Sequence, residues 1–131
     1  MKKLLVLLFS ILILPFSVYA SDVYYCSDDA ITAFDPAVNY KYENFTGQKF
    51  KIMIDFENKN VVSEKLYYGG VFDQKCWYRN DNDILYCMNE VGISFSINKL
   101  NSKFIRSKIY QSRDMSDGDH IFLGHGSCEK F

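Results

Sequence analysis

His125 and Cys128 stand three residues apart near the end of the chain, in the stretch HGSCEKF. A cysteine close to a histidine can act as a nucleophile beside its base, provided that the thiolate is free and the imidazole is within reach. If this stretch is a strand, however, residues three apart point to opposite faces of the sheet. We therefore predict that Cys128 has no catalytic role and is a structural cysteine.

The two histidines, His120 and His125, are five residues apart, so a continuous strand also sends them to opposite faces. Three acidic residues, Asp114, Asp117 and Asp119, precede His120 and offer oxygen ligands. They lack the regular calcium-loop spacing and its closing glutamate. We expect this stretch to be a solvated loop, with no metal site and no cofactor.

Signatures of the common enzyme classes do not occur in the chain. It has no glycine-rich phosphate loop, no Ser-His-Asp order and no pair of carboxylates in a glycosidase-like setting. The sequence therefore predicts a protein that is not an enzyme.

The first twenty residues have the pattern of a secretory signal peptide. Lys2 and Lys3 precede an apolar run from Leu4 to Ile13, Pro15 breaks this run, and Val18-Tyr19-Ala20 fits the small-residue cleavage rule. A membrane anchor needs about 20 apolar residues, and this run is shorter. We expect residues 1–20 to be cleaved and residues 21–131 to form a single domain without a transmembrane segment, either periplasmic or secreted.

Removal of Lys2 and Lys3 leaves 13 basic residues against 16 acidic ones, a formal net charge of −3. An electrostatic nucleic-acid binder needs a basic face. The charge balance therefore argues against nucleic acid as a partner.

Short β-type runs separated by turn residues predict the fold. In QKFKIMIDF, Phe50, Ile52, Ile54 and Phe56 fall on one face and Lys51, Met53 and Asp55 on the other. Further runs are DVYYC, VVSEKLYY, VFDQKCWYR, ILYCMNE, ISFSIN, KFIRSKIYQ and HIFLGHGSC. About eight strands at such spacing predict an all-β domain, either a small antiparallel meander barrel or a sandwich.

One segment, Ser27 to Gly47, is interpreted as a long irregular loop. A loop of this length in a small domain is often functional, or indicates that some structure was missed. The segment contains Tyr40, Tyr42 and Phe45, which we take as candidate binding residues.

Four cysteines follow the signal sequence, and an even number in an oxidising compartment favours two disulfides. If NDND at 80–83 is a four-residue hairpin loop, Cys76 lies opposite Cys87 in a non-hydrogen-bonded pair, where side chains approach most closely. Cys26 is then left with Cys128, which would join the first strand to the last and close a meander barrel.

The opening Tyr24-Tyr25-Cys26 and the closing Gly126-Ser127-Cys128 resemble the periplasmic C-type lysozyme inhibitors. The resemblance implies a small barrel whose early Tyr-x-Cys cysteine bonds to one near the C-terminus. The family's inhibitory Ser-Gly-x-x-Tyr loop is missing, and Val91-Gly92-Ile93-Ser94-Phe95 is too different to take over its role. The resemblance therefore carries a shape without the inhibitory activity.

Residues 21–131 contain 19 aromatic side chains, more than the core of a small barrel needs. Tyrosines are suited to binding because they offer a flat apolar face with a polar tip; the candidates are Tyr24, Tyr25, Tyr40, Tyr42, Tyr67 and Tyr68. We expect an exported binding or inhibitor-like protein whose partner is an extracytoplasmic protein or a glycan. The alternative is a structural, envelope-associated protein without a specific ligand.

Overall fold

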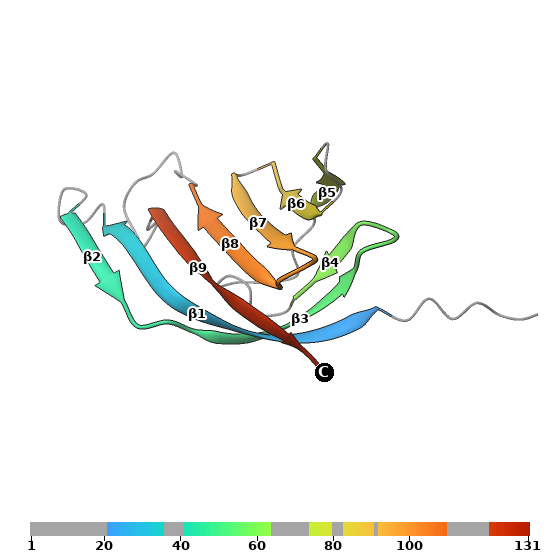
Figure 1. Ribbon diagram of the computed structural model, residues 1–131. Helices are drawn as coiled ribbons and strands as arrows, with labels where there is room; N and C mark the ends of the chain where they lie inside the picture. Colours follow the sequence, from blue (N-terminus) through green and yellow to red (C-terminus); the bar gives the residue numbers. More distant parts are fainter. Residues whose placement is uncertain (1–20, 36–40, 64–73, 80–82, 91, 110–120) are drawn as a thin grey trace, which may run out of the picture.

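The computed structural model describes residues 21–35, 41–63, 74–79, 83–90, 92–109 and 121–131, and these residues form an all-β domain (Figure 1). The strands are β1 (Asp22–Asp35), β2 (Lys41–Phe45), β3 (Lys49–Asp55), β4 (Asn60–Val62), β5 (Lys75–Tyr78), β6 (Ile84–Met88), β7 (Ile93–Asn98), β8 (Lys103–Lys108) and β9 (Ile121–Lys130). None of the described segments is a helix that could cross a membrane.

The strands form one antiparallel sheet in the order β4-β3-β1-β9-β8-β7-β6-β5, with β2 also paired to β1. The sheet curls into a nearly closed barrel, so the barrel alternative of the sequence prediction is confirmed and the sandwich is not (Figure 1). Strands β5 to β9 follow one another as a meander, and the last strand pairs with the first. The expected disulfide between Cys26 and Cys128 predicted this pairing of the first strand with the last.

Among the described strands, β4 and β5 stand at the two ends of the sheet, and side chains link these two ends. The amide of Gln74 donates to the carbonyl oxygen of Val61 over 3.0 Å. The hydroxyl of Tyr78 donates to the carbonyl oxygen of Phe56 over 2.7 Å. Desolvation raises the pKa of the Tyr78 hydroxyl, and the nearby carboxylate of Asp55 adds to this.

The prediction that Ser27 to Gly47 is a long irregular loop is wrong, because most of the segment belongs to a long hairpin. Strand β1 continues to Asp35 and pairs with β2, which begins at Lys41. Ile31 lies opposite Phe45 and Ser27 opposite Lys49, so β2 and β3 keep the same register against β1.

A β-bulge at Asp28 and Asp29 explains why the sequence of β1 lacks the regular alternation of one continuous strand. On the β9 side, Asp28 pairs with Gly126 and Ala30 with His125, so Asp29 is the extra residue. The buried positions of β1 therefore change from even numbers to odd numbers as the strand passes the bulge.

Both neighbours of the bulge carry glycine where the backbones meet. A Cβ atom at Gly126 would lie 2.0 Å from the carbonyl oxygen of Ser27, and one at Gly47 would lie 2.4 Å from that of Asp28. Both contacts are with backbone atoms, which cannot move aside as a flexible side chain can. Only glycine therefore allows the neighbouring strands to approach Ser27 and Asp28 this closely.

Apolar side chains on the inward faces of the strands fill the barrel and form its core. Phe104 stands at its centre, with its ring centroid 5.4 Å from that of Phe50 and 5.7 Å from that of Phe95. The predicted alternation in β3 is confirmed, since Phe50, Ile52 and Ile54 are buried. In the predicted run VVSEKLYY, the structure describes only residues 61–63, of which Val61 and Val62 belong to β4.

Both predicted disulfides are present. Cys26 bonds to Cys128 between β1 and β9, and Cys76 bonds to Cys87 between β5 and β6. Each pair is directly opposed, with Cα atoms 4.0 Å apart. For Cys76 and Cys87 this close approach matches the pair that the hairpin register predicted.

One charged pair lies inside the barrel, at the bulge. Arg106 of β8 donates to the carboxylate of Asp28 through Nε and through a terminal nitrogen, and its side chain is 2% exposed. The same guanidinium lies 3.3 Å from Oε1 of Gln48 and packs between the rings of Phe50 and Phe122. Burial without a partner would be very costly for either charge, so the pair holds β1 and β8 together.

Candidate functional site

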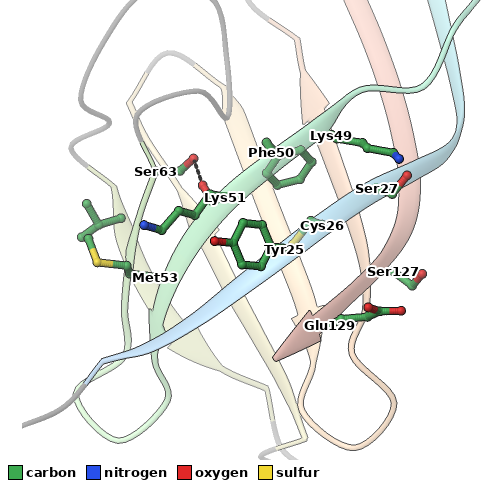
Figure 2. A pocket seen from close by; sticks show the side chains of 11 residues that line it. Tyr25, Cys26, Ser27, Lys49, Phe50, Lys51, Met53, Ser63, Ser127 and Glu129 are labelled. Carbon is green, nitrogen blue, oxygen red and sulfur yellow. Dashed lines mark hydrogen bonds between the residues drawn. The ribbon is translucent and has the colours of Figure 1, made fainter. Parts of the chain in front are cut away.

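A hollow of about 740 Å³ opens on the outer face of the sheet, where β3, β1 and β9 run side by side (Figure 2). Outward-facing side chains form most of its lining, and these come from alternate positions of the three strands. They are Tyr25 and Ser27 of β1, Lys49, Lys51 and Met53 of β3, and Ser127 and Glu129 of β9.

A polar row crosses four strands at one end of the hollow. Lys49 lies opposite Ser27, Ser27 opposite Ser127, and Ser127 opposite Lys103 of β8. Adjacent strands are about 4.8 Å apart, so the two lysine Cα atoms are separated by roughly 14 Å with two hydroxyls between them. Long flexible lysine side chains at both ends can therefore turn toward a ligand that rests on the serines.

A second row lies next to the first and contains an aromatic ring. Tyr25 stands between Lys51 of β3 and Glu129 of β9. Its side chain is 52% exposed, and its ring meets Phe131 edge-to-face at 5.8 Å. Figure 2 shows Tyr25 in the middle of the hollow, between the Lys49 end and the Met53 end.

The opposite end of the hollow is apolar. Met53 and Val62 are directly paired on β3 and β4, and both are exposed. Ser63 closes this end, because its hydroxyl donates to the carbonyl oxygen of Lys51 over 3.0 Å (Figure 2). The hollow thus runs from a basic, hydroxyl-rich end through a tyrosine to an apolar end.

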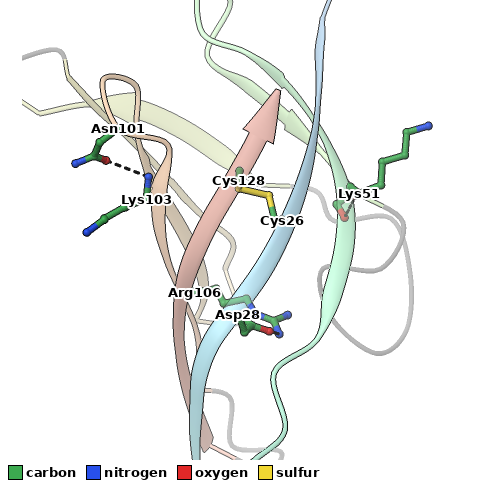
Figure 3. The surroundings of a disulfide bond; sticks show 8 residues. Cys26, Asp28, Lys51, Asn101, Lys103, Arg106 and Cys128 are labelled. Atoms are coloured by element: carbon green, nitrogen blue, oxygen red, sulfur yellow. Dashed lines mark hydrogen bonds and ion pairs between the residues drawn. A yellow bond between two sulfur atoms is a disulfide. The ribbon is translucent and has the colours of Figure 1, made fainter. Parts of the chain in front are cut away.

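The Cys26–Cys128 disulfide joins β1 to β9 (Figure 3), and Cys26 is among the residues that line the hollow. Cys26 sits between Tyr25 and Ser27 in β1, and Cys128 sits between Ser127 and Glu129 in β9. Because successive side chains alternate between faces, these four neighbours point outward while the sulfur atoms point into the core. The bond fixes the spacing of four lining residues.

The charge of the hollow differs from that of the chain. Its described lining carries Lys49 and Lys51 against the single carboxylate of Glu129, with Lys103 at the rim, whereas the whole chain has a formal net charge of −1. The hollow is therefore a locally basic surface on a slightly acidic protein.

An ion pair joins the ends of β1 and β9, at positions opposite the core residues Ile54 and Tyr24 and outside the lining of the hollow. Nζ of Lys130 lies 2.8 Å from a carboxylate oxygen of Asp22, and this hydrogen bond raises the pKa of the Lys130 amine. Burial raises the pKa of the neighbouring Tyr24 hydroxyl, with a smaller contribution from Asp22. Lys130 is thus engaged by Asp22, in contrast to the lysines that line the hollow.

Of the binding residues expected from the sequence, the structure describes Tyr42 and Phe45, which point to opposite faces of β2. Tyr42 is exposed on β2 and meets Phe34 edge-to-face at 6.1 Å, while its hydroxyl donates to Asn44. Phe45 lies three residues further along the same strand and so points to the opposite face. Tyr40 lies outside the described residues, as do Tyr67 and Tyr68.

The side chains of His125 and Cys128 point to opposite faces of β9, as predicted. Cys128 is buried in a disulfide, and the side chain of His125 is 61% exposed on the other face, 4.0 Å from Asp29. His120, Asp114, Asp117 and Asp119 lie outside the described residues. In the part of the chain that is described, no three histidine, cysteine or acidic side chains form a group that could hold a metal.

No family model, curated protein or solved structure matches this chain. The function must therefore be argued from the geometry of the site.

The hollow was not predicted from the sequence, although one of its lining residues had been noted as a candidate. Tyr25 was among the surplus tyrosines, and the structure separates it from the buried Tyr24. Lys49 and Lys51 had the pattern of an ordinary solvated strand face. Only the pairing of β1 with both β3 and β9 places these side chains beside Ser27 and Ser127.

Proposed function

We propose that the β domain is an extracytoplasmic binding module and that the hollow over β3, β1 and β9 is its recognition surface. One observation carries the proposal: a concave surface in which a row of lysines and serines adjoins an exposed tyrosine, over a disulfide that fixes their spacing.

The chemistry of the lining supports binding. Its lysine and serine side chains are hydrogen-bond donors, and Tyr25 supplies a flat apolar face with a polar tip. Acid–base chemistry needs titratable groups that converge on one point. Here Glu129 lies on β9 and the two lysines lie on β3, with β1 between them.

The scaffold supports recognition as well. A binding surface that is rigid before it meets its ligand loses less conformational entropy on binding. The lining residues of β1 and β9 lie on strands paired on both sides, and all four of them flank the cysteines of one disulfide. Such a surface keeps its shape in the free protein.

The compartment is part of the proposal. Disulfides persist in oxidising environments and are rare in the cytosol. Two disulfides and the signal-like residues 1–20 together support export to the periplasm or the medium.

Two other possibilities predict different outcomes. If the arm formed by β1 and β2 binds the partner, Tyr42 is required and Tyr25 is not. If the protein has only a structural role in the envelope, no saturable partner exists. The resemblance to lysozyme inhibitors adds no residue to the proposed surface, because the inhibitory loop motif is absent from the sequence.

A capture experiment separates these outcomes. Purified residues 21–131 are immobilised and exposed to envelope and extracellular fractions of the producing cells, over a range of concentrations. We expect saturable capture by the wild type and at least tenfold weaker capture by Tyr25→Ala combined with Lys51→Ala.

Tyr42→Ala combined with Lys75→Ala is the matched control. Tyr42 is 55% exposed in a strand, close to the 52% of Tyr25, and Lys75 is an exposed strand lysine outside the hollow. The control should capture as the wild type does. Absence of saturable capture, or loss of capture in the control alone, would contradict the proposed surface.

A further inference from the structure

The geometry points to an acidic oligosaccharide as the ligand of the hollow: a sugar chain bearing carboxylate or sulfate groups, with an acidic group over Ser27 and Ser127 and a sugar ring against Tyr25. This inference rests on the proposed binding function and names the chemistry of its ligand.

The polar row selects for negatively charged oxygen. An ammonium group donates hydrogen bonds and accepts none, while each serine hydroxyl can donate one. Lys49, Ser27, Ser127 and Lys103 therefore form a line of donors across four strands, and in the described lining Glu129 is the one charged acceptor beside it. Carboxylate and sulfate groups supply several acceptor oxygens at one point, together with the charge that the lysines complement.

The tyrosine next to this row suits a sugar ring. One face of a pyranose presents C–H groups, which pack on an aromatic ring, while its hydroxyls need polar partners at the sides. Tyr25 offers such a ring between Lys51 and Glu129, a donor on one side and an acceptor on the other. The Phe131 ring supports Tyr25 edge-to-face and so restricts its movement.

A peptide strand fits the hollow less well. Extended peptides commonly bind by adding a strand to a free sheet edge, where main-chain groups are unpaired. The hollow lies on the face of β1, whose main chain is already paired with β3 on one side and β9 on the other. Recognition here depends on side chains.

A membrane surface fits less well too. An anionic bilayer attracts basic side chains that protrude from a surface, whereas these lysines line a concave hollow.

The test is direct binding by calorimetry at low and at physiological salt. The probes are a hexasaccharide of uronic acids, its fully methyl-esterified form and a sulfated hexasaccharide. The esterified form keeps the rings and removes the charge. We expect one or both acidic sugars to bind, with weaker binding at higher salt, and the ester to bind at least tenfold more weakly.

Variants locate the acidic group. Lys49→Ala and Lys103→Ala should each weaken binding of the acidic sugar roughly two- to fivefold, the range for exposed charge pairs. Tyr25→Ala should weaken both the acidic sugar and its ester, and Lys75→Ala should change neither.

Several results would overturn the inference. These are equal binding of the ester and the acid, no binding of either acidic sugar, or tighter binding of an acidic peptide, anionic vesicles or a single-stranded oligonucleotide of matched charge. If the sugars fail while the capture experiment still shows partner binding that depends on Tyr25, the binding function stands and the sugar ligand is wrong. If both fail, the hollow is not a recognition surface.

Discussion

Arg106 and Asp28, 78 residues apart in the sequence, form a two-point ion pair inside the barrel. The pair joins β8 to the bulge of β1, across the intervening strand β9 (Figure 3). Asp28 continues the inward alternation of Tyr24 and Cys26, and the bulge begins directly after it; the neighbouring glycines allow the strands to approach closely there. The ion pair, the bulge and the glycines are therefore parts of one structural unit beside the hollow.

Asp28→Ala should strongly destabilise the protein. It leaves the Arg106 guanidinium buried without its carboxylate partner, and breaking a buried pair in this way costs about 3–5 kcal/mol. Urea unfolding followed by circular dichroism would measure the loss. Asp29→Ala, at the exposed neighbouring position, should change the free energy of unfolding by less than about 1 kcal/mol. A similar small loss in both variants would show that the ion pair does not stabilise the barrel.

Gly126→Ala should destabilise the barrel because the new methyl group would meet the carbonyl oxygen of Ser27. Relief requires a shift of β9 away from β1, and overpacking of this kind costs about 1–3 kcal/mol. Thermal unfolding would show a lower midpoint. Ser127→Ala, one residue further on and facing outward, should unfold within a few degrees of the wild type. An unchanged midpoint for Gly126→Ala would mean that the strands do not approach this closely.

The two disulfides should contribute unequally. The chain-entropy model gives about 4 to 5 kcal/mol for Cys26–Cys128, with a sequence separation of 102, and about 3 kcal/mol for Cys76–Cys87, with a separation of 11. Unfolding of the two double alanine variants, Cys26→Ala with Cys128→Ala and Cys76→Ala with Cys87→Ala, would compare these contributions. Removal of the first bond should also weaken ligand binding more than removal of the second, because Cys26 is among the residues that line the hollow. The reverse order of binding loss would count against a disulfide-fixed recognition surface.

Part of this fold is predictable from the sequence because the relevant information is local. The alternation in β3 follows from residues two apart, and the Cys76–Cys87 register follows from the loop NDND. The Cys26–Cys128 bond then follows from closing the meander.

The parts that were missed depend on long-range contacts. The bulge at Asp29 shifts the buried positions of β1, so residues 27–35 show no regular alternation and were interpreted as a loop. Arg106 belongs to a strand that was predicted, but its burial depends on a carboxylate from β1. The hollow depends on the mutual register of β3, β1, β9 and β8, which no single stretch of sequence contains.

Alkaline pH should weaken the barrel through Tyr78. Its pKa is raised in the folded state, so the folded protein holds the hydroxyl proton more tightly than the unfolded chain does. This stabilisation is complete below the unfolded pKa near 10 and is lost as pH rises through the higher folded pKa. We expect the free energy of unfolding to fall as the pH rises above about 10.

Tyr78→Phe isolates this contribution. The variant loses the hydrogen bond to Phe56, which should cost about 1 kcal/mol at neutral pH. Its stability should then fall less steeply with alkaline pH than that of the wild type. Parallel pH profiles for the two proteins would exclude Tyr78 as the titrating group.

The central claim is that the outer hollow over β3, β1 and β9 recognises an acidic oligosaccharide, and nuclear magnetic resonance tests it most directly. Backbone amide shifts of 15N-labelled residues 21–131 would be followed during titration with the uronic acid hexasaccharide. We predict that saturable shifts cluster at residues 25–27, 49–51 and 127–129. Shifts confined to residues 41–45 of the arm, or to the stacked rings of Trp77 on β5 and Tyr86 on β6, would contradict it. The absence of saturable shifts would contradict it as well.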